Sequence, residues 1–297
     1  MQNRFVGLAL ILFLLAGAAV AQPDRLQLRT DSLTTRDSDD LAASATPLRA
    51  TMDGMPFQWQ VGEELFYKVK YTFFTVGDLY FQVKKADTVR GNPVFHCHMH
   101  MKSNSRIPFV NIDDTYDSMI DADEFYSHEF WAYEQQKDHV LYTHYDFDYD
   151  AGEVRIIEKK LFESDTVQTL DSTAVLDVRV QDGLSLLFFA RANSATSNRQ
   201  DVNVFAFNKL SQTFINFSGK QEEVSVKDSK VDGWFLDGKM KFVGIAGIKE
   251  DFKGWFAPGP QKVPVEAHMK AFLGSVKLFI DDWNNWEEGS ERFTRKD

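Results

Sequence analysis

The chain has 297 residues, of which 33 are basic and 44 acidic, so its formal net charge at pH 7 is -11. This charge argues against bulk attraction to nucleic acid or to anionic membrane surfaces. The single cysteine, Cys97, excludes an internal disulfide framework. The hydrophobic fraction of 43% is ordinary for a globular protein, whose core must therefore be stable without crosslinks.

Residues 1–21 have the pattern of a cleaved secretory signal peptide. Arg4 supplies the positive charge, residues 5–15 are almost all apolar, and Ala19 and Ala21 are the small residues that a cleavage site needs. The alternative, a membrane anchor, is disfavoured because a spanning helix needs about 20 apolar residues. No lipobox cysteine follows, and no later segment is long and apolar enough to span a bilayer. We therefore expect an exported protein, periplasmic or secreted, with no membrane span after signal removal.

The rest of the chain divides by composition into three parts. Residues 22–56 are polar and poor in large apolar side chains, which predicts a flexible linker. Aromatic density rises at Phe57, where we expect a single β-rich domain to begin and to extend over residues 57–282. Residues 283–297 form a charged C-terminal tail, in which Trp283 and Trp286 are candidates for packing back onto the domain.

Apolar residues within the domain recur with a period of two, as in strands that have one buried face. In the first run the residues that share the apolar face are Leu65, Tyr67, Val69, Tyr71 and Phe73. Further strands are predicted at residues 79–83, 94–101, 115–120, 125–133, 139–147, 154–162, 202–207, 214–217, 238–249, 254–256, 263–272 and 275–280. Turn residues separate the runs at 91–93, 150–152, 218–220 and 258–260. This pattern predicts a mainly all-β fold, a curved antiparallel sheet that closes into a barrel or half-barrel.

One segment departs from the strand pattern and predicts a short helix over residues 182–192. Asp182 is suited to cap the first turn, and Leu184, Leu187, Phe188 and Arg191 follow helical spacing. We expect this helix to lie across the curved sheet or to plug it. Ser185 then supplies a hydroxyl early in the helix.

Four short motifs, in order, resemble those of DUF3108, a bacterial envelope domain of unknown function. They are G-E-x-L-x-Y at residues 62–67, D-x-Y-x-S-x-I-D at 114–121, a D-x-x-S helix start at 182–185, and a P-V strand at 264–265 with a G-S-x turn at 274–276. The resemblance covers residues 57–282. Residues 254–258 depart from it, because they read G-W-F-A-P where the family has W-x-S-x-D. The resemblance implies an exported β-rich fold with no established activity and no catalytic residues to carry over.

The sequence around Cys97 alternates histidine with cysteine and methionine. On a strand, His96, His98 and His100 share one face, and three imidazoles can bind zinc or copper. Neighbouring histidines on one face lie about 6.5–7 Å apart at Cα, so all three on one ion would be strained. The alternative is that Cys97 and the methionines fill the core and that the histidines lie on a half-solvated face.

Signatures of other chemistry are weak or absent. Residues 146–152 resemble the start of a calcium loop, but Ala151 stands where that loop needs glycine and Ile157 where it needs glutamate. No nucleophile elbow, phosphate-binding loop, dinucleotide motif or H-E-x-x-H sequence is present. We expect no cofactor, and no residue is assigned a catalytic role.

The abundant aromatic residues are the remaining functional signal. Trp59, Trp131, Trp234 and Trp255 lie inside the predicted domain, and a surplus of aromatic side chains on a concave face would form an apolar pocket or a platform for a sugar. We take these four tryptophans as candidate ligand-binding residues. The alternative is that they pack in the core of the sheet.

These observations favour a non-catalytic envelope protein that binds a hydrophobic or amphipathic, lipid-like ligand in the concavity of its sheet. Two alternatives stay open. A hydrolase of envelope glycans would require two carboxylates about 5–10 Å apart beside an open groove. A scaffold would dock an envelope protein partner through a sheet edge or an acidic face. A sheet filled by its own side chains would contradict the ligand hypothesis.

Overall fold

The computed structural model describes residues 51–105, 111–227, 229–240, 251–270 and 275–286, together with the backbone of 294 and 295. The predicted signal peptide and residues 22–50 of the predicted linker lie outside the described residues. So do residues 241–249 of one predicted strand and residues 271–272 of another.

The described chain forms one large antiparallel sheet and the helix α3 (Gly183–Asn193). The sheet begins at the edge strand β8, continues through β7 to β1, passes to β14, and ends through β13 to β9, with β15 beside β11. The strands are β1 (Glu64–Tyr71), β2 (Phe74–Val89), β3 (Asn92–Ser103), β4 (Asp113–Asp121), β5 (Ser127–Gln135), β6 (Val140–Asp148), β7 (Glu153–Leu161), β8 (Thr166–Val175), β9 (Ser197–Ala206), β10 (Lys209–Val226), β11 (Ser229–Met240), β12 (Asp251–Phe256), β13 (Pro264–Lys270), β14 (Ser275–Asn284) and β15 (Thr294–Arg295).

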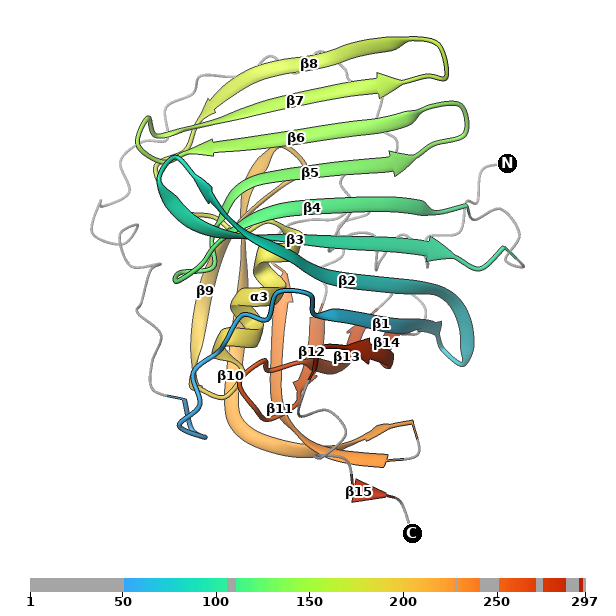
Figure 1. Ribbon diagram of the computed structural model, residues 1–297, viewed down its shortest axis with the longest axis vertical. Coiled ribbons are helices and arrows are strands. Elements are labelled where there is room, and N and C mark those ends of the chain that lie inside the picture. The colour runs from blue at the N-terminus through green and yellow to red at the C-terminus, as the bar shows by residue number, and fades with distance from the viewer. Residues whose placement is uncertain are drawn as a thin grey trace.

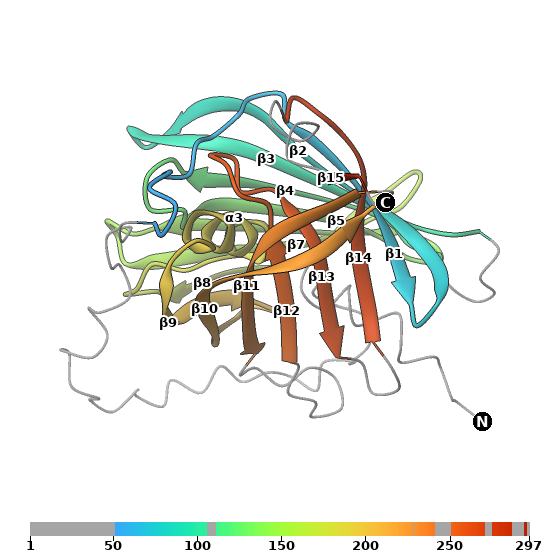
Figure 2. The same ribbon diagram turned by 90° about the horizontal axis from the view of Figure 1, so that it is seen from below.

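The sheet is strongly curved, and α3 lies inside the curve. Strands β3–β8 run across the view in Figure 1, whereas β9–β12 run nearly perpendicular to them. Figure 2 shows α3 enclosed between these two halves. The two edge strands, β8 and β9, do not pair with each other, so the sheet is a half-barrel and not a closed barrel. The predicted fold class is confirmed, and the short helix falls where the sequence placed it.

Alternation along the strands explains which face of the sheet forms the core. On β3 the side chains of Cys97, Met99 and Met101 are buried, while the intervening histidines are half-buried on the outer face. The prediction for the first strand is correct up to Tyr71, the last residue of β1, and wrong for Phe73. The chain turns at Thr72, whose φ is 54°, and the side chain of Phe73 is 79% exposed beyond that turn.

Two features of the sheet differ from the sequence prediction. Strand β8 was not predicted, because as an edge strand it carries mostly exposed side chains on both faces. Residues 218–220, predicted as a turn, instead form a bulge within the long strand β10. Gly219 has a φ of 63°, and a Cβ atom there would lie 2.7 Å from Cβ of Ser197. Glycine at this position therefore permits a bend and a close approach between strands.

Hydrogen bonds fix the start of α3 to the sheet. The Asp182 carboxylate accepts from the backbone N–H groups of Leu184 at 2.7 Å and Ser185 at 2.8 Å, and the Ser185 hydroxyl accepts from the Asp182 N–H at 2.7 Å. This is a capping box, which satisfies amide groups that the helix leaves unpaired. The Ser118 hydroxyl of β4 donates to Oδ2 of Asp182 at 2.6 Å, and so ties the cap to the sheet.

A buried ion pair fixes the last turn of α3. The Arg191 guanidinium donates to both carboxylate oxygens of Glu63, at 2.7 and 2.8 Å, and also to the Gln261 carbonyl oxygen. The Gln261 side chain donates to Oε2 of Glu63 at 2.7 Å. These groups join the helix, the residue before β1 and the loop between β12 and β13.

Residues on both sides of the predicted domain contact it. The backbone N–H of Met52 donates to the Ala195 carbonyl at 2.7 Å, and Asp53 forms an ion pair with the buried Lys262. At the other end, Trp286 is buried in the main core cluster and Trp283 packs against it. The boundaries drawn at residues 56 and 282 stay predictions, although contacts with the sheet extend past both.

Replacement of Arg191 by methionine should cost about 3–5 kcal/mol of unfolding free energy, because it leaves the Glu63 carboxylate buried without its partner. Chemical denaturation measures the change. Lys230→Met is the control, since Lys230 pairs with Glu223 on the surface, where an ion pair contributes at most about 1 kcal/mol. Equal losses in the two variants would show that the buried pair does not hold the helix.

Candidate functional site

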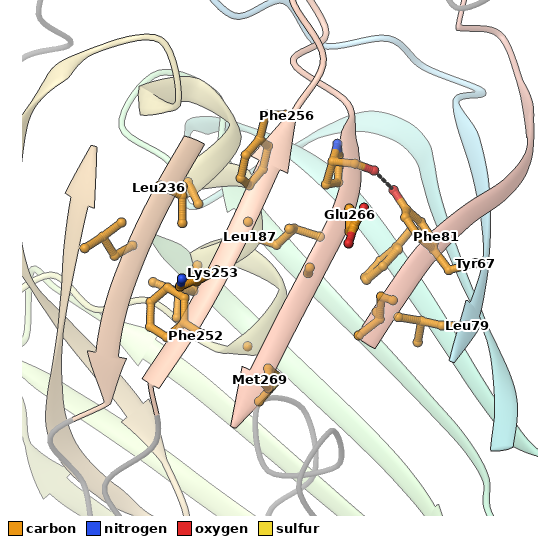
Figure 3. Close-up of a pocket in the computed structure, with 18 residues that line it drawn as sticks. Tyr67, Leu79, Phe81, Leu187, Leu236, Phe252, Lys253, Phe256, Glu266 and Met269 are labelled. Carbon is orange, nitrogen blue, oxygen red and sulfur yellow. Dashed lines mark hydrogen bonds between the residues drawn. The ribbon is translucent and has the colours of Figure 1, made fainter. Parts of the chain in front are cut away.

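An apolar cavity lies between α3 and the strands that face it. About 140 Å³ of its space is open to the centre of a water molecule, roughly ten times what one water needs. Protein interiors are close-packed and rarely leave voids of this size. Figure 3 shows side chains from the helix and from strands on both sides pointing into this space. The lining residues are Tyr67, Leu79, Phe81, Gly183, Leu186, Leu187, Ala190, Ile215, Leu236, Phe252, Lys253, Gly254, Phe256, Pro264, Glu266, Ala267, Met269 and Leu278.

Small residues on opposite walls create the space. Gly183 and Ala190 belong to the helix wall, and Gly254 and Ala267 belong to β12 and β13 on the strand wall. Because the helix is fixed at both ends, it cannot move closer to the strands and fill the gap. The Tyr67 hydroxyl, which borders the cavity, donates to the Pro264 carbonyl at 2.7 Å and so presents no free polar group (Figure 3).

Two of the lining residues carry charge, and each has a neighbour outside the cavity. The Lys253 ammonium lies 5.9 Å from the centroid of the Phe235 ring. The Glu266 carboxylate contacts the His268 ring on the same strand. Phe252 and Gly254 line the cavity on either side of Lys253, and Ala267 follows Glu266, so alternation along the strands directs both charged side chains to the opposite face of the sheet. The side chains that enter the cavity are therefore apolar, apart from the paired Tyr67 hydroxyl.

The concavity of the other half of the sheet is filled by aromatic side chains. Tyr145 and Phe147 of β6 meet Phe205 of β9 edge-on, with ring centroids 5.1 and 5.6 Å apart. Phe130 stacks between Tyr145 and Tyr116. The ligand hypothesis thus does not apply to the concavity as a whole, but to the part beside α3.

The four candidate tryptophans lie outside the residues that line the cavity. Trp59 stacks on Phe95 at 4.4 Å, and Trp131 stacks on a histidine of the outer face. Trp234 is buried in a second core cluster, and Trp255 is buried and donates its indole N–H to Glu222. Ligand binding by these tryptophans stays a prediction. The cavity residues had no local signal, because glycine, alanine and leucine are common everywhere in a sequence.

The three candidate metal-binding histidines lie on the outer face of β3, beside aspartates of β4. His96 and His98 both contact the Asp117 carboxylate, at 2.6 and 3.1 Å, whereas His100 contacts Asp113 at 2.6 Å. Hydrogen bonds from His96, His98 and Lys84 hold the pKa of Asp117 well below its usual range, against the effect of burial. The aspartates thus divide the histidines into a pair and a single residue. Within the described residues, no group of three or more His, Cys, Asp or Glu side chains is placed to hold a metal ion.

The segment that resembles a calcium loop has a structural role. Asp146 and Asp148 both pair with Arg90 of the neighbouring turn. Oδ1 of Asp148 also accepts from the N–H groups of Asp150 and Ala151, which closes the turn between β6 and β7.

Comparison with known proteins identifies the family. The model of the family described as "Protein of unknown function (DUF3108)" matches residues 67–281. The chain belongs to the DUF3108 family. No curated protein matches the sequence.

Solved structures with a similar fold have very different sequences. A β-barrel-like DUF1849 protein from Brucella abortus is 9% identical, with a TM-score of 0.49 over 75% of this chain and 97% of that one. A protein with a YmcC-like fold from Bacteroides fragilis is 9% identical, with a TM-score of 0.36 over 78% and 99%. LprF from Mycobacterium bovis is 10% identical, with a TM-score of 0.27 over 75% and 86%.

The DUF3108 domain also buries a pair of carboxyl groups on the inner face of its sheet. The Tyr116 hydroxyl donates to Oε1 of Glu134 at 3.2 Å, while Oε2 of Glu134 is buried without a hydrogen-bond partner among the described residues. Asp114 lies beside them and accepts from the Gln135 N–H at 2.7 Å. Burial raises the pKa of Asp114 to about 6, and burial together with the Asp114 charge raises the pKa of Glu134 well above its usual value. Close packing around these groups makes this pair unlike the exposed acids of a hydrolase groove.

The raised pKa of Asp114 predicts a pH dependence of stability. Between pH 3.8, the ordinary value, and about 6, the folded protein holds more protons than the unfolded chain, so the Asp114 contribution to stability falls as pH rises. Asp114→Asn removes this contribution, and its stability relative to wild type should therefore rise by about 2 kcal/mol from pH 4 to pH 7. Urea denaturation at both values measures it, with Asp232→Asn on the exposed face of β11 as control. A difference that does not change with pH would contradict the assignment.

Metal binding at His96, His98 and His100 stays a prediction of the sequence. If these histidines bind metal, purified protein should retain zinc or copper. The variant His98→Ala should lose the metal, because His98 is the central member of the three. Elemental analysis of both proteins tests this, and equal metal content in the two would contradict it.

Proposed function

We propose that this protein binds a hydrophobic or amphipathic, lipid-like ligand in the cavity beside α3. The observation that carries the proposal is the cavity itself, because the side chains that point into it are almost all apolar. An apolar void of this size holds water poorly and accepts apolar groups. Ligand sites are usually concave and mostly apolar, and this cavity has both properties.

The apolar lining favours an acyl chain or a similar group as the part of the ligand that enters the cavity. A polar end of such a ligand would stay in solvent, because burial of a polar group without a hydrogen-bond partner costs free energy. Binding of this kind needs no bond chemistry, and the proposal is for a non-catalytic protein.

We also propose that the protein works outside the cytoplasm, periplasmic or secreted. The support is the sequence of residues 1–21, with its charged start, apolar run and small residues at the cleavage site. Among the residues that the structure describes, no helix is both long enough and apolar enough to cross a membrane.

The geometry gives less support to a glycan hydrolase. Glu266 is the one carboxylate among the described residues that line the cavity, whereas hydrolysis of a glycosidic bond uses two carboxylates on either side of a groove. Asp114 and Glu134 are both buried, and neither lines the cavity.

Replacement of Ala267 by phenylalanine should weaken ligand binding about tenfold, because the added ring would displace about two methylene groups of the ligand at about 0.8 kcal/mol each. Titration of purified protein with a fluorescent fatty acid measures the affinity, and native mass spectrometry of protein from its own envelope shows any retained lipid. Ala267 is half-buried in the cavity wall on β13.

Ala86→Phe is the matched control, since Ala86 is an exposed strand residue on β2 outside the cavity. Thermal denaturation of both variants establishes that each is folded. Fatty-acid binding that is unchanged in Ala267→Phe, or equally weakened in both, would contradict the cavity as the binding site.

A further inference from the structure

The turn between β1 and β2 exposes two adjacent aromatic side chains. Phe73 is 79% exposed and Phe74 is 62% exposed, and their ring centroids lie 4.2 Å apart. Figure 1 shows this turn at the end of the β1–β2 hairpin, on the right-hand side of the sheet. A pair of large apolar side chains in water is costly, because each would contribute about 1.5–3 kcal/mol if buried.

The conformation of the turn does not explain these residues. Two-residue hairpin turns favour glycine and asparagine, since at least one residue takes a positive φ. Here Thr72 holds a φ of 54°, although a branched side chain is disfavoured in that region. Thr72 and Phe73 therefore lower the stability of the folded protein at this turn. This indicates that the turn residues serve a function other than folding.

Three lysines of β1, β13 and β14 lie on the outer face of the sheet, at the end of the sheet where the turn is. Lys70 and Lys277 are direct cross-strand partners, and Lys270 is the partner of Ser275, whose carbonyl accepts from the Thr72 N–H at 3.0 Å. Like charges directly opposite each other destabilise a sheet.

None of these three lysines has an ion-pair partner among the described residues, in contrast with Lys68, which pairs with Asp78 at 2.6 Å and lies near Asp281. Lys70 contacts the face of the Phe279 ring instead, at 4.9 Å from its centroid. The three lysines thus add positive charge to the outer face of the sheet, in a chain whose net charge is -11.

We propose that the β1–β2 turn docks on an anionic phospholipid membrane. Phe73 and Phe74 would enter the boundary between headgroups and acyl chains, and Lys70, Lys270 and Lys277 would contact anionic headgroups. Aromatic residues combined with basic ones are the composition of interfacial membrane anchors, and the two contributions add. The net negative charge does not prevent this, because at physiological salt a charge acts over a Debye length of about 8 Å and the turn reaches the surface first.

The position of this turn relates the membrane to the cavity. Tyr71 is the cross-strand partner of Val276, Val276 of Met269, and Met269 of Phe252, so these residues form one row across four strands. Met269 and Phe252 line the cavity. A docked turn would hold that end of the cavity wall close to the lipid surface. The docking proposal itself rests on outer residues only and does not depend on what the cavity binds.

Vesicle flotation with the purified mature chain tests the proposal. The protein is expected to float with vesicles of phosphatidylcholine and phosphatidylglycerol at low salt, and to bind vesicles of phosphatidylcholine alone far less. Phe73→Ser with Phe74→Ser should lower the partition coefficient roughly tenfold for each ring. Substitution of Lys70, Lys270 and Lys277 by glutamine should lower it roughly fivefold for each lysine, and high salt should have the same effect.

Two control variants distinguish docking by this turn from general adhesion. Val175→Ser removes an equally exposed apolar side chain, 89% exposed, from the edge strand β8. Lys137→Gln with Lys160→Gln removes lysines from the loop and strand near that edge. Both controls should bind vesicles as the wild type does. Failure of the wild type to bind anionic vesicles, or equal losses in controls and turn variants, would overturn the proposal and leave the aromatic pair to a protein partner.

Fluorescence gives a second, independent measurement. Phe73→Trp places an indole at the tip, and its emission in anionic vesicles, compared with that of the unsubstituted chain, should shift to shorter wavelength and be quenched by brominated lipid. A shift without quenching would place the tip outside the acyl boundary and contradict insertion. Ala267→Phe should leave flotation unchanged. Flotation therefore tests membrane docking alone, and fatty-acid titration tests the cavity alone.

Discussion

The buried pair between Arg191 and Glu63 is the interaction on which the arrangement of this protein depends. A charge in a protein interior is tolerated only when it is paired and its hydrogen bonds are satisfied. Here the guanidinium donates to both oxygens of Glu63 and to the carbonyl of Gln261, so the pair joins three separate parts of the chain, the helix included. These hydrogen bonds are directional, so they fix the position of the last turn of α3 relative to β1 and to the β12–β13 loop. The capping box at Asp182, held by Ser118, does the same for the start of the helix.

The cavity follows from these two attachments. A helix that packs only through apolar side chains can slide or tilt until voids close, because apolar contacts are not directional. A helix held by directional hydrogen bonds at both ends cannot. Where the helix and the strands both contribute small residues, such as Ala190 and Ala267, space remains. The protein thus uses costly buried polar groups to keep apolar space open, and four of its family motif positions, at 63, 118, 182 and 185, take part in these attachments.

The sequence predicted the class of fold and the position of the helix because both have local signals. Alternation on β3 and the cap at Asp182 are visible in a few consecutive residues. Strand β8 has no such signal, because an edge strand that buries neither face shows no alternation, and Gly219 is ambiguous, because glycine is common both in turns and in bulges. The cavity was not predictable, since its residues come from the helix and seven strands and are individually ordinary. The tryptophans have a signal in the sequence because they are rare and large, whereas the cavity is formed where residues are small.

Phe73 lies outside the core although the sequence pattern places it inside. Alternation from Leu65 onward assigns it to the buried face, and it would be buried if β1 continued for two more residues. Instead the chain reverses at Thr72, and the aromatic pair is placed outside, beside lysines that lack acidic partners. A globular protein with this net charge gains nothing from these features in water, because exposed rings favour aggregation and facing lysines repel. At a surface with an apolar interior and negatively charged headgroups, burial of the rings and neutralisation of the lysines would both favour binding. An anionic bilayer is such a surface, and it is also where a lipid-like ligand would be found, so the turn and the cavity have a common physical context.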